Sequence, residues 1–252
     1  ILRFHAVIWP AMLMAAGIAI PKKVFAHGWL LVGGEKMSKS KLTGIAPSDI
    51  TDHFGVDAFR YYFLRAIPFG SDGSFSWEDM SARYTSELAN DFGNLASRSA
   101  AMIEKYCGGK VPAVAKDAAL AEALTATVEK CDAAMVALDF QGGINAVMDF
   151  CKQVNGFVTI KEPWILAKDP ANQAVLEEVL YNTAESLRAL AVLLHPVMPA
   201  TTEILWESLG AKAALGEIGA QPISGVATWG QLPPGARVTK TPVLFPRLEV
   251  KE

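Results

Sequence analysis

Two lysines separated by two residues are the clearest candidates for chemistry. Lys36 and Lys39 flank Ser38 in a segment rich in lysine and serine that follows Gly33-Gly34. Flexible ammonium groups beside small hydroxyls and exposed backbone amides suit a triphosphate, and they can neutralise the charge that develops as pyrophosphate leaves. On charge alone, a solvated surface loop would be the better interpretation.

A second candidate group combines an amide, a guanidinium and an indole. Asn94 and Arg98 are four residues apart, so on a helix they would project from one face. Trp164 follows a proline at a predicted helix start, where an indole could stay partly exposed. Edge contacts and stacking of this kind capture single-stranded bases. Spacing alone favours a solvated Asn/Arg pair and a core tryptophan.

The elements that would position the lysine loop have α/β character. Residues 2–17 predict a buried helix with a kink at Pro10, and residues 24–26 and 30–32 read as short buried strands. After the loop, Ser48 is a good N-cap for a helix over 49–53, and a second helix is expected over 56–66. The order helix, strand, loop suggests an α/β unit.

The rest of the chain predicts a helical bundle. Ser76 and Asp79 resemble a capping box at the start of a long helix that Gly108-Gly109 ends. Apolar residues keep a spacing of three to four in further segments, at 120–135, 140–158, 176–194 and about 200–209. Each has a single apolar stripe, so these helices must pack on one another. Residues 210–252 are rich in Gly and Pro and predict an extended strap.

Composition excludes few classes of function. The net charge is −3, but RNA contact needs only a local basic or aromatic surface. The three cysteines have no metal-ligand spacing and form no disulfide framework. The apolar start is interrupted too often for a membrane span and lacks signal-peptide features, so no membrane association is expected. Because the chain starts on Ile within a dense core pattern, we expect it to be the tail of a longer protein.

The sequence resembles the methionine-specific class I aminoacyl-tRNA synthetases over nearly its whole length. Lys36-Met37-Ser38-Lys39-Ser40 matches the signature loop of class I letter for letter. The other segments that carry the resemblance are Arg3-Phe4-His5, Trp9-Pro10-Ala11, His27-Gly28-Trp29, Phe54 to Tyr62, Asn94 to Arg98, Glu162-Pro163-Trp164 and His195-Pro196-Val197-Met198-Pro199.

The resemblance implies roles for the residues of the first part. Lys39 would contact the ATP phosphates and stabilise adenylate formation with help from Lys36, so these two are the expected catalytic residues. ATP, with Mg²⁺, would also meet Ser38, His27 and Leu30. His5 and Trp9 would line the methionine pocket, and an aromatic wall suits a polarizable thioether. Without the resemblance, a core tryptophan and a buried histidine would be favoured.

The resemblance also implies the partners. Asn94, Arg98 and Trp164 would read the methionine anticodon, and the partners would be methionine, ATP and the initiator and elongator methionine tRNAs, in the cytoplasm and without DNA. The activity would be that of a methionine–tRNA ligase serving translation initiation and elongation. The His-x-Gly-His type motif of class I does not occur here. We therefore expect this chain alone to be inactive, and any zinc to belong to an upstream part.

The expected fold class is the C-terminal portion of a Rossmann-type α/β catalytic domain followed by an all-α anticodon-binding bundle. The expected domains are 1–33, the end of the catalytic domain; 34–75, the lysine loop and a connecting region that contacts the tRNA stem; 76–210, the bundle; and 211–252, the strap. The alternatives are a standalone RNA-binding helical module with a vestigial ATP loop, a nucleotidyltransferase that does not use tRNA, and a structural interaction domain.

Overall fold

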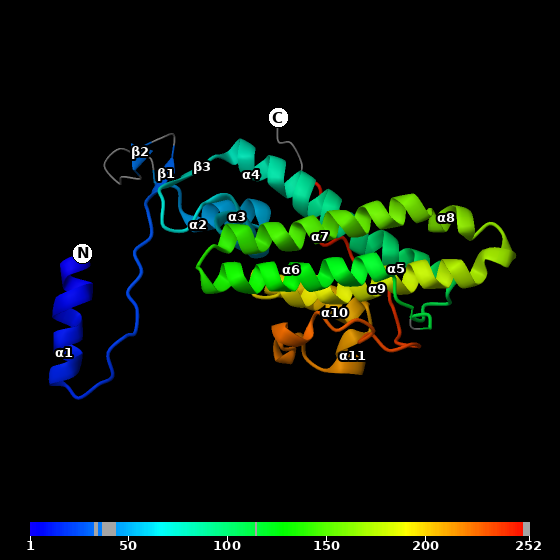
Figure 1. Ribbon diagram of the computed structural model, residues 1–252. Helices are drawn as coiled ribbons and strands as arrows, with labels where there is room; N and C mark the ends of the chain where they lie inside the picture. The colour runs from blue at the N-terminus through cyan, green and yellow to red at the C-terminus, as the bar shows by residue number, and fades with distance from the viewer. Residues whose placement is uncertain (33–34, 37–43, 114, 249–252) are drawn as a thin grey trace.

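The N-terminal helix stands apart from the rest of the molecule. The computed structural model describes residues 1–32, 35–36, 44–113 and 115–248 (Figure 1). The first helix consists of a π-helical stretch, η1 (Phe4–Ile8), followed by α1 (Trp9–Ala15). Pro10 lies in the first turn of α1. None of its residues is buried, so the expectation of a buried helix is wrong for the described chain. The reason is that an extended segment separates α1 from the other described elements, whose core does not include it (Figure 1).

A small sheet follows this segment. β1 (Leu30–Val32) lies between β2 (Glu35–Lys36), to which it is antiparallel, and β3 (Gly73–Phe75), to which it is parallel. The parallel pair is joined through α2 (Pro47–Phe54) and α3 (Val56–Ala66), the kind of crossover that parallel strands require. The strand expected at 24–26 is extended chain outside the sheet. The sequence analysis did not predict β3, because the first residue of this strand ends a run of turn-forming residues.

The helix start expected at Ser48 is wrong. α2 begins two residues earlier, with Ala46 as its N-cap and Pro47 in its first turn. The fixed φ of proline and its missing N–H suit that position. Asp49 then accepts the Ala46 N–H at 2.9 Å through its carboxylate. α3 spans 56–66, as predicted.

The long helix predicted after Ser76 is present but is not uniform. It consists of α4 (Trp77–Arg83), the π-helical stretch η3 (Tyr84–Gly93) and α5 (Asn94–Tyr106). Ser76 caps it by accepting the Asp79 N–H at 3.1 Å. In a full capping box the Asp79 carboxylate would also accept the backbone N–H of Ser76, but this bond is absent from the described contacts. The carboxylate instead accepts from Arg83 Nε at 3.0 Å. The sequence did not predict the π-helical bonding. Apolar residues spaced three to four apart do not reveal a turn that contains one more residue than an α-helical turn.

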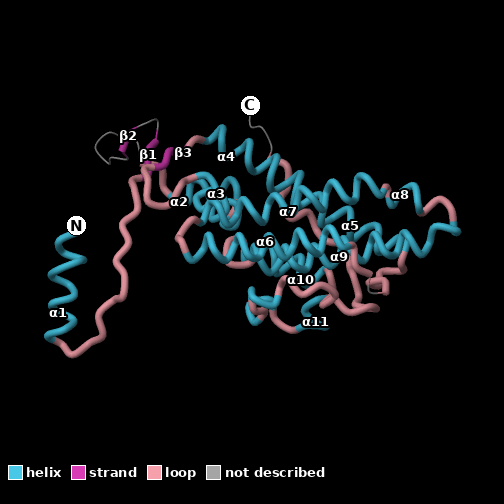
Figure 2. Tube along the Cα trace, in the orientation of Figure 1, coloured by secondary structure: helices cyan, strands magenta, loops and turns pink. Residues whose placement is uncertain are grey.

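The remaining helices form the predicted bundle. α6 (Ala118–Val136), α7 (Phe140–Lys161) and α9 (Gln173–Leu194) lie along one another, with α10 (Pro199–Ser208) beyond α9 (Figures 1 and 2). Between α7 and α9 are the short α8 (Pro163–Leu166) and a 3-10 turn, η4 (Pro170–Asn172). All α9 residues from 179 to 194 are buried, which makes this helix the centre of the core. The expected fold class, an α/β portion followed by a helical bundle, is confirmed.

The segment after the bundle packs on it but is not wholly extended. It contains α11 (Ala211–Leu215) and two 3-10 turns, η5 (Ile218–Ala220) and η6 (Ile223–Gly225). Leu232, Val238 and Phe245 are buried in the common core. The short helix escaped sequence analysis because it is too brief to show a period.

Two of the motif segments hold α3 against α10. The Asp57 carboxylate accepts the backbone N–H of Thr201 in the first turn of α10 at 2.6 Å. Arg60 donates from Nε to the Val197 carbonyl at 2.9 Å and from Nη2 to the Pro196 carbonyl at 2.7 Å. A helix N-terminus favours a negative group, and its first N–H groups have no helical acceptor. Asp57 therefore caps α10 from a different part of the chain.

We expect Asp57→Ala to lower the free energy of unfolding by about 1–2 kcal/mol, because it leaves an N-terminal amide of α10 without its acceptor. Urea unfolding followed by circular dichroism measures the change. Asp52→Ala is the control, since Asp52 is exposed on the neighbouring α2. Equal stability losses in the two variants would contradict the capping role.

Candidate functional site

Arg98 is held between two helices and keeps unused donors. Its Nη2 donates to Oδ1 of Asn155 on α7 at 2.9 Å. Asn155 is itself fixed, because its Nδ2 donates to the carbonyls of Asp91 at 2.9 Å and Cys151 at 3.1 Å. The Nε of Arg98 is buried with no hydrogen-bond partner in the described structure. Desolvation lowers the pKa of the Arg98 guanidinium, which nevertheless stays charged. It is a preorganised cation that can still bind an acceptor.

Asn94 and Trp164 are the other two residues predicted to read the anticodon. Asn94 is exposed one turn before Arg98 on α5. Trp164 lies on α8, where Glu162 adopts a left-handed conformation (φ 44°) and turns the chain away from the axis of α7. Trp164 is 38% exposed, so part of this large aromatic residue is accessible to a ligand. Asn155 lies on α7 before this turn, so α7 connects the Arg98 contact to Trp164.

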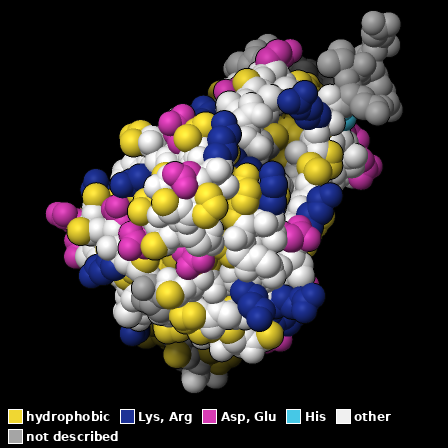
Figure 3. Space-filling model, turned by 90° about the vertical axis from the view of Figure 1, so that its right-hand side faces the viewer, with side chains coloured by type: hydrophobic (Ala, Val, Ile, Leu, Met, Phe, Trp, Pro, Cys, Tyr) yellow, Lys and Arg dark blue, Asp and Glu magenta, His cyan; other side chains and the backbone are white. Residues whose placement is uncertain are grey.

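The end of the molecule that carries α8 has a mixed surface. Figure 3 looks onto this end and shows clusters of Lys and Arg side chains separated by apolar side chains and by some acidic ones. Basic groups beside exposed apolar and aromatic side chains are typical of surfaces that bind single-stranded nucleic acid.

His5 and Trp9 share one side of the first helix, as their spacing predicts. Their ring centroids lie 6.5 Å apart in an edge-to-face arrangement, and the Trp9 side chain is 39% exposed. His5 Nδ1 lies 3.0 Å from the Ile1 carbonyl oxygen. The described structure does not bring these two rings to His27 or Leu30, because α1 stands apart (Figure 1).

His27 and Leu30 line a cavity of about 170 Å³ between β1 and the turn that precedes β3. His27 stacks on Phe69 with 5.9 Å between ring centroids, and its Nδ1 lies 2.8 Å from the Gly28 carbonyl oxygen. A side chain at Gly28 would collide with the backbone of Ser71, so the two segments can approach only through a glycine.

The lysine loop is described only at its start. The backbone of Lys36 pairs with Leu31 in the sheet, which places the loop directly after β1 and β2. Ser38 and Lys39 lie outside the described residues. Elsewhere in the described ranges, no group of three or more His, Cys, Asp and Glu side chains could hold a metal ion. No helix within those ranges is long and apolar enough to cross a membrane.

Sequence reasoning missed Asn155, which orients Arg98. The residue lies on the predicted helix 140–158, but nothing in its local pattern sets it apart from other polar helix positions. Its separation from Arg98 along the chain is 57 residues, so only the packing of α5 against α7 reveals the contact.

Two family models match the chain. Residues 1–100 match the class I tRNA synthetases of the M type, and residues 117–222 match the anticodon-binding domain of tRNA ligases. The methionine–tRNA ligase of Streptomyces coelicolor is 62% identical over the whole chain, and that of Bacillus subtilis is 41% identical. The chain belongs to the methionyl-tRNA synthetase family.

Solved structures of the methionyl-tRNA synthetase family have the same fold. The chain superimposes on the Mycobacterium tuberculosis synthetase in complex with methionyl-adenylate with a TM-score of 0.85 at 37% identity, and on its apo form with a TM-score of 0.83 at 34% identity. Each match covers 98% of this chain and 48% of that structure. The chain likewise spans 48% of the Streptomyces coelicolor protein and 38% of the Bacillus subtilis one. The family resemblance stated from the motifs is confirmed.

Proposed function

We propose that this chain supplies the anticodon-reading part, and a portion of the ATP site, of a methionine–tRNA ligase. The whole enzyme would activate methionine with ATP to methionyl-adenylate, release pyrophosphate, and transfer the methionyl group to the 3′ end of methionine tRNA. Both initiator and elongator tRNAs would be substrates, which fits a role in the initiation and elongation of translation. Because translation is cytoplasmic, we propose the same location for the enzyme.

The observation that carries the proposal is the half-buried Arg98, which Asn155 anchors through Nη2 and whose Nη1 has no hydrogen-bond partner among the described residues. Because Arg98 is partly exposed and its orientation is fixed by Asn155, the Nη1 donor can reach a ligand without a change of side-chain conformation. The edge of an anticodon base provides hydrogen-bond acceptors, and the exposed Asn94 beside it adds a donor and an acceptor. Trp164, on α8 directly after the helix that bears Asn155, would stack on a base.

The ATP and methionine sites are proposed from the family motif. Lys36, Ser38 and Lys39 would bind the ATP phosphates with Mg²⁺, and the ammonium group of Lys39 would stabilise the charge that forms on pyrophosphate. His27 and Leu30, which line the small cavity beside β1, would approach the adenosine. His5 and Trp9 present adjacent rings on one side of the first helix and would contact the methionine side chain. Zinc, if the enzyme uses it, would be bound by residues other than the described ones.

Trp164→Ala tests the anticodon-reading role. In the protein expressed from its complete gene, we expect kcat/KM for charging of methionine tRNA to fall by about ten-fold, because stacking on one base contributes about 1–3 kcal/mol. Methionine-dependent ATP–pyrophosphate exchange should stay unchanged, since adenylate formation does not involve the anticodon.

The matched control is Ile165→Ala, which shortens a neighbouring apolar side chain of α8 that is 44% exposed. It should leave charging within about two-fold of the parent. Unchanged charging by Trp164→Ala would remove this residue from the site. Equal charging of a tRNA with a changed anticodon by the parent protein would contradict the proposed function as a whole.

A further inference from the structure

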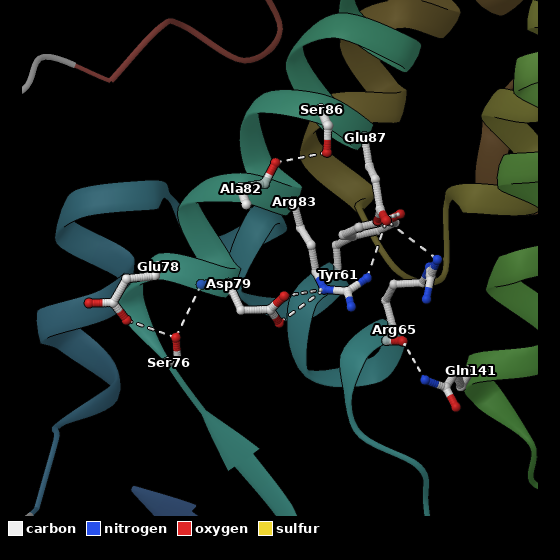
Figure 4. Close-up of polar contacts among 10 residues, drawn as sticks. All are labelled: Tyr61, Arg65, Ser76, Glu78, Asp79, Ala82, Arg83, Ser86, Glu87 and Gln141. Atoms are coloured by element: carbon white, nitrogen blue, oxygen red, sulfur yellow. Dashed lines mark hydrogen bonds and ion pairs between the residues drawn. The ribbon is translucent and has the colours of Figure 1, made fainter. Parts of the chain in front are cut away.

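A single carboxylate ties the long helix to α3, ahead of the residues proposed to read the anticodon. Glu87, on η3, accepts a hydrogen bond from the Tyr61 hydroxyl at 2.6 Å. Its other oxygen accepts from Arg83 Nη1 at 3.2 Å and from Arg65 Nη2 at 3.4 Å. Figure 4 shows the Glu87 side chain pointing toward both guanidinium groups, with Tyr61 beside them. Glu87 thus links η3 to α3 and α4.

The network is extended and shielded from water. The side chains of Glu87 and Arg65 are 14% and 15% exposed, so solvent screens their ion pair less than it would a surface pair. The Arg65 carbonyl accepts from Gln141 Nε2 at 3.2 Å, which adds α7 to the network (Figure 4). Burial, and next the hydrogen bond to Glu87, raise the pKa of the Tyr61 hydroxyl far above its usual range. Tyr61 is therefore a permanent donor to Glu87.

Glu87 lies within a stretch of helix that has π-helical bonding. The stretch runs from Tyr84 to Gly93, and the N–H that follows it, that of Asn94, donates to Ala89, five residues earlier. Such stretches are rare and persist where tertiary contacts hold them. The contacts here are the Glu87 network on one side and, on another, the Tyr84 hydroxyl, which donates to the Pro246 carbonyl of the C-terminal segment at 2.8 Å.

The π-helical stretch sets the direction in which Asn94 and Arg98 point. Asn94 is the first residue of α5 and comes directly after it. Each residue of an α-helix turns the chain by about 100°. Conversion of one π turn to an α turn would shift the register by one residue and rotate the downstream side chains by about that angle. Arg98 would then lose its alignment with Asn155.

We propose that Glu87 is a positioning residue for the anticodon-reading face. Its carboxylate, held from α3 by Tyr61 and Arg65, fixes the π-helical register and thereby aims Asn94 and Arg98. This role rests on the proposed function, because it assigns Glu87 an effect only through residues that would bind the tRNA.

Glu87→Gln is the test, in the protein expressed from its complete gene. The amide keeps the size but removes the charge that two guanidinium groups share. We expect KM for methionine tRNA to rise by about ten-fold, while kcat for charging and the rate of ATP–pyrophosphate exchange change by less than about two-fold. The preference for the cognate anticodon over a changed one should fall as well. A purely structural defect would instead lower both activities together by reducing the active fraction.

The matched control is Glu78→Gln on α4, whose carboxylate is exposed and bonds only to the Ser76 hydroxyl among the described side chains, at 2.8 Å. It should leave every parameter unchanged. In the Asn94→Ala/Arg98→Ala background, Glu87→Gln should add less than about two-fold to KM, because its effect would pass through these two residues. Full additivity would overturn the positioning role.

The two proposals fail in different ways. If Arg98→Ala raises KM for tRNA and Glu87→Gln does not, the positioning role alone is wrong. If Arg98→Ala itself has no effect, the proposed function fails and the positioning role with it. Should Glu87→Gln not fold, Tyr61→Phe removes one hydroxyl from the same network, and an unchanged anticodon preference in that variant would equally overturn the proposal.

Discussion

Glu185→Ala is expected to lower the free energy of unfolding by about 3–5 kcal/mol, because it leaves a buried cation without its counter-charge. Glu185 and Arg188 are buried on α9, with side chains 0% and 2% exposed, and Glu185 Oε1 accepts from Arg188 Nε at 2.9 Å. The same carboxylate accepts three consecutive backbone N–H groups, those of Gly230, Gln231 and Leu232, at 2.9–3.1 Å. Alanine would leave all four donors unsatisfied.

Arg188 shows why the loss would reach the C-terminal segment. Its Nη2 donates to the Val226 carbonyl at 3.0 Å, so the ion pair anchors both ends of the 226–232 stretch to α9. Urea unfolding measures the loss. Glu178→Ala, at an exposed position of the same helix, is the control and should stay within about 0.5 kcal/mol of the parent. A loss no larger than that of the control would contradict the account of the buried pair.

The helices were predictable because each has an apolar stripe that must be buried. Leu120, Leu124 and Cys131 mark the buried side of α6, as their spacing indicates, and α3 has the predicted ends because glycine and the Ile67-Pro68 turn flank it. The first helix has a similar apolar content and is nevertheless exposed in the described chain. The periodicity of apolar residues predicts that one face of a helix must be buried, but it does not identify the element that buries it.

Contacts between distant segments were not predictable. β3 is only three residues long and is recognisable as a strand only through its pairing with β1. Glu87 is distinguished from other acidic helix residues only by its contacts with α3. The same holds for Asn155 and Glu185, whose partners lie tens of residues away along the chain. Arg98 contacts α7 through Asn155, and Trp164 lies on α8, which follows α7. The roles of Asn94, Arg98 and Trp164 come from the family motif and are still to be tested.

Arg98→Lys is expected to reduce kcat/KM for charging of methionine tRNA by about ten- to a hundred-fold, the effect of losing a guanidinium contact to a base edge. Lysine keeps the positive charge but lacks the planar fork, so it cannot donate to Asn155 and to a base at the same time with fixed geometry. Because the charge is kept, long-range attraction of the tRNA should persist, and the salt dependence of KM should change little.

Lys105→Ala separates the loss of a specific donor from the loss of general charge on α5. Lys105 is exposed on the same helix, where its Nζ lies 5.0 Å from the centroid of the Tyr106 ring. We expect this variant to weaken charging of all tRNAs slightly and equally, whereas Arg98→Lys should lower the discrimination between the methionine anticodon and a changed one. If Arg98→Lys lowers charging without any loss of discrimination, Arg98 acts as a phosphate contact and does not read the anticodon bases.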